Sequence, residues 1–115
     1  MRRVLHMTAF DPAPIAELQD ELPPEALACL LATFEADLGR LVAELVHAAQ
    51  AGDRAAYLHA AHSLAGTAAN VGLVGLAEAA RVAMDPAQPE PPDRLLPRLL
   101  DAGREGLDAL RAFIG

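Results

Sequence analysis

The feature that most constrains this chain is a long run of apolar residues at the spacing of one helical face. Between residues 27 and 45 they recur every three or four positions, which places them along one stripe of a helix. The stripe consists of Leu27, Leu30, Leu31, Phe34, Leu38, Leu41, Val42 and Leu45. A helix of this length with one apolar side needs other helices to cover it, and a chain with only 3 Phe and 1 Tyr favours helices over sheet. The pattern predicts an all-α fold.

Similar spacing predicts four more helices and two irregular segments. The helices are expected over 11–20, 54–70, 73–84 and from about residue 93 to Phe113, the last with Leu96, Leu99, Leu100, Gly103, Leu107, Leu110 and Ile114 inward. Pro97 is then acceptable only in the first turn. Residues 1–10 are expected to be a flexible lead-in and 85–93 a proline-rich loop. The expected architecture is one domain over 1–115, an antiparallel four-helix bundle with a short additional N-terminal helix.

The helix over 54–70 has clear ends and two distinct sides. Gly52 can end the preceding helix, Asp53 can cap this one, and Gly72 can reverse the chain after it. Its expected core stripe is Tyr57, Ala61, Leu64, Ala68 and Val71. On this assignment His62 lies on a different side, shared with Leu58, His59, Ala65, Gly66 and Ala69.

A glycine one turn after this histidine calls for a physical reason. Gly66 lies four residues after His62 on the same face, and glycine inside a helix costs about 1 kcal/mol relative to alanine. The simplest reason is access to the imidazole.

This stretch resembles the signature of the histidine-containing phosphotransfer (Hpt) domain. The matching residues are Ala61, His62, Leu64, Gly66, Gly72 and Leu76. The resemblance extends from about Asp11 to Met84 and more weakly over the last helix. One departure is plain, because the family usually has lysine where this chain has Ala65.

The resemblance implies a phosphoryl carrier rather than an enzyme. His62 would accept a phosphoryl group from a receiver-domain aspartate and pass it to a second receiver, in a phosphorelay with a hybrid sensor histidine kinase upstream. The partner would bring Mg²⁺, and the chain would need no cofactor of its own. Leu58, His59, Ala65, Gly66 and Ala69 would contact the receiver, and the carrier would be a monomer. The missing lysine would slow transfer or leave the phosphohistidine less stable, unless Arg54 or Arg81 replaces it.

Other interpretations stay open at this point. His62 could be a core histidine within the bundle. His59 and His62 are only half of a metal site, so none is expected. The chain could be an Hpt-like module that binds or sequesters a receiver without transfer, or a helical adaptor unrelated to signalling.

The charge and the cysteine content limit the partners and the cellular location that we expect. A net charge of -7 argues against nucleic acid or an anionic membrane as partner. Residues 55–77 carry no formal charge, but their histidines, hydroxyls and glycines argue against a membrane span. Cys29, the only cysteine, is interpreted as a small buried apolar residue, and without a second cysteine there is no internal disulfide. A cytoplasmic location is expected.

Overall fold

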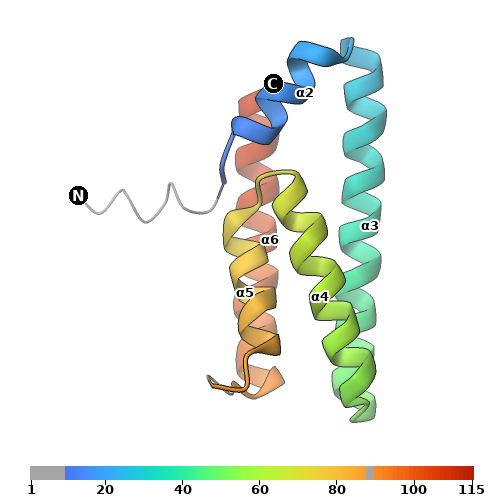
Figure 1. Ribbon diagram of the computed structural model, residues 1–115, viewed down its shortest axis with the longest axis vertical. Helices are drawn as coiled ribbons and strands as arrows, with labels where there is room; N and C mark the ends of the chain where they lie inside the picture. The colour runs from blue at the N-terminus through green and yellow to red at the C-terminus, as the bar shows by residue number, and fades with distance from the viewer. Residues whose placement is uncertain (1–9, 88–89) are drawn as a thin grey trace, which may run out of the picture.

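The computed structural model describes residues 10–87 and 90–115, and these form an all-α bundle (Figure 1). Its helices are α2 (Ala13–Glu21), α3 (Pro24–Ala51), α4 (Arg54–Asn70), α5 (Val74–Met84) and α6 (Pro92–Ile114). The last four run alternately down and up, while the short α2 lies across one end. The predicted fold class is confirmed. Residues 1–9 of the expected lead-in lie outside the described residues.

The helix ends follow from local chemistry. Proline occupies the first turn of α2, α3 and α6, where its missing N–H costs nothing. The Asp53 carboxylate caps α4 by accepting a hydrogen bond from the Ala56 N–H at 3.1 Å. Gly52 ends α3 with a φ of 70° and Gly72 forms the turn after α4 with a φ of 81°, as the sequence predicts. The start of α6 at Pro92 falls inside the segment expected to be loop, because a proline can open a helix.

The core is built from leucines on α3 and α6 and alanines on α4 and α5. Leu38, Leu41 and Leu45 of α3 are buried, and Leu95 and Leu99 of α6 are fully so. The facing sides of α4 and α5 contribute mainly small side chains, including Ala60, Ala61, Ala68, Ala77 and Ala80. α4 packs against both α3 and α5, and α5 also packs against α6.

Several packing predictions are wrong. Cys29 is exposed rather than buried, because the N-terminal part of α3 extends past the end of α4 (Figure 1). Leu100 is 47% exposed and Ile114 37% exposed. Leu99 already faces inward, and its neighbour in a helix is rotated by about 100° away from that direction. Ile114 ends α6, where no further turn covers it.

Pro97 lies in the second turn of α6 and not the first. Its ring removes the N–H that would bond to the Asp93 carbonyl. Both residues are exposed, so water can reach the carbonyl that loses its partner.

Candidate functional site

His62 lies in the middle of α4 and is exposed to solvent. The rotation of α4 is set by Ala61, Leu64 and Ala68, each with no exposed surface. Because these side chains face the core, the imidazole one residue after Ala61 is turned outward. The possibility of a core histidine is thereby excluded.

The residues expected around His62 are only partly on the exposed side. His59, Gly66 and Ala69 are exposed and Leu58 is half-buried. Together with His62 they form a surface that we call the His62 face. Ala65 is 6% exposed and belongs to the core, so its expected place on this surface is wrong. It follows Leu64 at the edge of the core stripe, where the neighbouring helices cover it.

The His62 face carries no formal charge, since residues 55–77 contain no aspartate, glutamate, lysine or arginine. A partner can therefore approach it without removing water from an ion on this face. A negatively charged group on the imidazole would find no neutralising charge on α4 itself beyond Arg54, in its first turn.

Gly66 has no structural role that requires glycine. Its φ is not positive, and a Cβ built on it would meet nothing within 4 Å. The helix thus gives up about 1 kcal/mol for a side chain that nothing in the described bundle excludes. No contact within the described bundle therefore accounts for a glycine at this position.

The structure also brings together two histidines that the sequence left unconnected. His47 of α3 and His59 of α4 line one groove, which also contains Arg40, Glu44 and Asp53. No sequence motif marks His47, because its nearness to His59 depends on how α3 and α4 align. Among the described residues no group of three or more His, Cys, Asp or Glu side chains could hold a metal ion.

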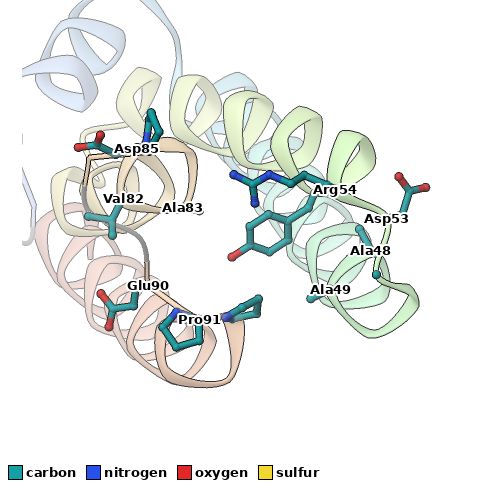
Figure 2. Close-up of a pocket in the computed structure, with 13 residues that line it drawn as sticks. Ala48, Ala49, Asp53, Arg54, Val82, Ala83, Asp85, Glu90 and Pro91 are labelled. Atoms are coloured by element: carbon teal, nitrogen blue, oxygen red, sulfur yellow. The ribbon is translucent and has the colours of Figure 1, made fainter.

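A cavity of about 550 Å³ opens at the N-terminal end of α4, where α3, α4, α5 and the start of α6 meet (Figure 2). Tyr57 lines it and is 5% exposed, and its hydroxyl has no hydrogen-bond partner among the described residues. Arg54 lies at the same cavity (Figure 2). Burial raises the pKa of Tyr57, and the positive charge of Arg54 partly opposes this. Arg54 is therefore placed beside Tyr57, two turns of helix before His62.

The raised pKa of Tyr57 predicts a loss of stability in alkali. The unfolded chain releases the phenol proton near pH 10, whereas the folded chain keeps it to higher pH, so the free energy of unfolding falls as the pH rises above about 10. Tyr57 is the only tyrosine and there is no tryptophan, so ultraviolet absorbance follows its ionisation directly. In Tyr57→Phe this component of the pH dependence should vanish, with a stability at pH 7 within about 1 kcal/mol of native because the hydroxyl has no partner to lose. An unshifted phenol titration would contradict the prediction.

The fold and site together define a class of protein, a helical bundle that presents an exposed histidine on an uncharged helix face beside a glycine. A family model of the Hpt domain matches residues 29–113, which is most of the chain. The chain belongs to the Hpt domain family, whose members carry phosphoryl groups on a histidine in two-component signalling and interact with receiver domains. Comparisons with curated proteins and with solved structures gave no match. No helix of the described residues is long and apolar enough to cross a membrane.

Proposed function

We propose that the chain acts as one Hpt domain that carries a phosphoryl group on His62 between the aspartates of two receiver domains in a multistep phosphorelay. The observation that supports this most directly is the exposed imidazole one turn from Gly66, on a face without charge. A hybrid sensor histidine kinase would stand upstream. The proposed setting is the cytoplasm, and the proposed carrier is a monomer.

The chemistry asks little of this chain beyond position. The lone pair of the unprotonated imidazole nitrogen attacks phosphorus, an N–P bond forms, and the P–O bond to the receiver aspartate breaks to leave a carboxylate. The second transfer reverses these roles with another aspartate. Mg²⁺ bound to the receiver would neutralise charge during both steps, so the chain itself supplies a nucleophile held on a rigid helix.

The test is transfer of labelled phosphoryl groups from a phosphorylated receiver domain to this protein in the presence of Mg²⁺. We expect label that is lost in acid and kept in base, as an N–P bond requires. Binding without label across a broad panel of receivers would instead favour a module that sequesters receivers. The neutral side chain at Ala65, where the family usually has lysine, is the observation behind that second candidate.

Enlarging Gly66 should separate stability from function. We expect Gly66→Gln to stabilise the fold by about 0.5–1 kcal/mol, because glutamine is a better helix former and the space is open. The same side chain should obstruct the partner beside His62 and slow transfer by about tenfold or more, equivalent to 1.4 kcal/mol. Thermal unfolding and the transfer assay measure the two effects.

Gly39 of α3 offers a matched control, since it is exposed and its built Cβ also meets nothing within 4 Å. Gly39→Gln should give a similar gain in stability with unchanged transfer. Equal transfer rates for the two variants would show that the partner does not need the notch at Gly66.

A further inference from the structure

A phosphoryl group on His62 would place negative charge on a helix face that carries no positive charge to neutralise it. We propose that Arg81 of α5 provides the missing cation and that its guanidinium contacts the phosphoryl oxygens on His62. This inference rests on the proposed function and adds to it a named residue on the neighbouring helix. Three features of Arg81 support it: its level along the bundle, the side of α5 on which it lies, and the absence of an ion pair with any described residue.

The first step concerns height along the bundle. α4 and α5 are neighbouring antiparallel helices joined by the short turn around Gly72. His62 is eight residues before the end of α4 at Asn70, and Arg81 is seven residues after the start of α5 at Val74. At 1.5 Å per residue these positions lie about 12 Å and about 10 Å from the turn. The two side chains therefore start at the same level of the bundle.

The second step concerns the side of α5. Val82 lies on the side of α5 towards Glu90 and the start of α6 (Figure 2). On the helical period, buried Ala77 and half-buried Met84 lie on the opposite flank, which must face the other neighbour, α4. Arg81 is four residues after Ala77 and three before Met84, and it is exposed. It therefore lies at the outer edge of the flank that faces α4.

The third step concerns the side of α4. Ala56 lines a groove together with α3, which identifies the flank of α4 towards α3. His62 lies about 120° around the helix from Ala56, and half-buried Leu58 lies about 160° from it, both on the opposite flank. That flank faces α5. Helices packed through small residues have axes about 8 Å apart, a gap that an arginine side chain spans.

The fourth step compares the arginines of the described residues. Arg40, Arg98, Arg104 and Arg111 each form an ion pair. Arg54, Arg81 and Arg94 form no ion pair with a described residue. Arg54 lies at the Tyr57 cavity, and Arg94 is in the first turn of α6, a helix that packs mainly against α5. Of these three arginines, only Arg81 lies at the same level of the bundle as His62 and on the flank that faces α4.

The acidic residue nearest to Arg81 along α5 does not remove this role. Glu78 lies one turn before Arg81 and is exposed, but no ion pair joins the two. It is also about 60° further round the helix, away from α4. When a dianionic phosphoryl group arrives, it offers the guanidinium a bidentate partner stronger than a single exposed carboxylate.

The proposal is tested by measuring both the rate of transfer and the equilibrium ratio of phosphohistidine to receiver aspartyl phosphate. We expect Arg81→Gln to lower each by about tenfold or more, since a charge-assisted hydrogen bond to the product is lost. Arg94→Gln makes the same change of charge at an exposed arginine on α6 and should leave both quantities unchanged. Arg81→Lys should give a ratio between those of the native chain and Arg81→Gln, because it keeps the charge but loses the bidentate contact.

A second substitution tests whether a positive charge near His62 determines the ratio of phosphohistidine to receiver aspartyl phosphate. In Arg81→Gln, adding Ala65→Lys should restore the ratio, because a lysine rooted between α4 and α5 can extend its ammonium to the surface beside His62. Arg81→Gln and Arg94→Gln with equal rates and ratios would overturn the role of Arg81. If the native chain accepts no label from any receiver, the proposed function fails instead, so the two failures are distinguishable.

Discussion

His62→Ala is expected to accept no phosphoryl label from a phosphorylated receiver while folding like the native chain. Alanine offers no nucleophilic nitrogen, so the N–P bond cannot form. The side chain is exposed and forms no hydrogen bond with a described residue, so its loss should change the free energy of unfolding by no more than about 0.5 kcal/mol. Thermal unfolding and label transfer on the same preparation measure both quantities.

His59→Ala is the matched control for this prediction. His59 is exposed on the same helix, one turn before His62, and belongs to the His62 face. The His59→Ala variant should still accept the phosphoryl label, with at most a reduced affinity for the receiver. If His62→Ala still accepts label, or if only His59→Ala fails to accept it, the phosphoryl acceptor is a histidine other than His62. His47, in the adjoining groove, would then be tested next.

Receiver binding by His62→Ala carries separate information. Leu58, His59, Gly66 and Ala69 remain in this variant, so a receiver that docks on the His62 face should still bind. Binding without transfer in the variant, together with transfer in the native chain, would separate docking from chemistry. Loss of both would indicate that the imidazole itself contributes to docking.

The fold was largely predictable because the signals that specify it are local. Asp53 and Gly72 mark the ends of α4 through a cap and a left-handed turn, and both can be recognised without knowledge of the partner helices. The three- and four-residue spacing of Ala61, Leu64 and Ala68 likewise predicts the buried side of α4, and with it the outward position of His62.

The errors concern the width of a buried face, which depends on neighbouring helices. Ala65 was expected at the surface but is covered, and Leu100 was expected in the core but is 47% exposed. Both residues lie directly beside a buried residue in the sequence, Leu64 or Leu99. The distance to the next helix decides whether such a neighbouring side chain is covered or exposed. Cys29 is exposed for a related reason, since its stretch of α3 has no α4 beside it.

The position of Arg81 shows the same division between local and tertiary information. The sequence shows an arginine within α5, but its level relative to His62 follows only from the short antiparallel turn. α4 and α5 approach closely because alanines line both helices. The turn at Gly72 sets their alignment, so this glycine matters for both stability and the site.

Gly72→Ala is expected to cost the fold about 3 kcal/mol or more. Gly72 has a φ of 81°, a conformation that costs an L-residue about 1–2 kcal/mol. A Cβ at this position would also lie inside van der Waals contact with the backbone carbonyl of Asp11. Relief of that clash would separate the two segments and break the 2.7 Å hydrogen bond from the Asp11 N–H to the Gly72 carbonyl, worth about 1 kcal/mol.

Gly52→Ala isolates the cost of the clash from the cost of the conformation. Gly52 has a φ of 70°, but a Cβ built there meets nothing within 4 Å, so only the backbone penalty of about 1–2 kcal/mol applies. Chemical denaturation of both variants should therefore show a loss at Gly72 that exceeds the loss at Gly52 by at least about 1 kcal/mol. Equal losses would mean that the contact between Asp11 and Gly72 contributes nothing, and that α2 is held to the bundle only by side chains such as Ile15, which is fully buried.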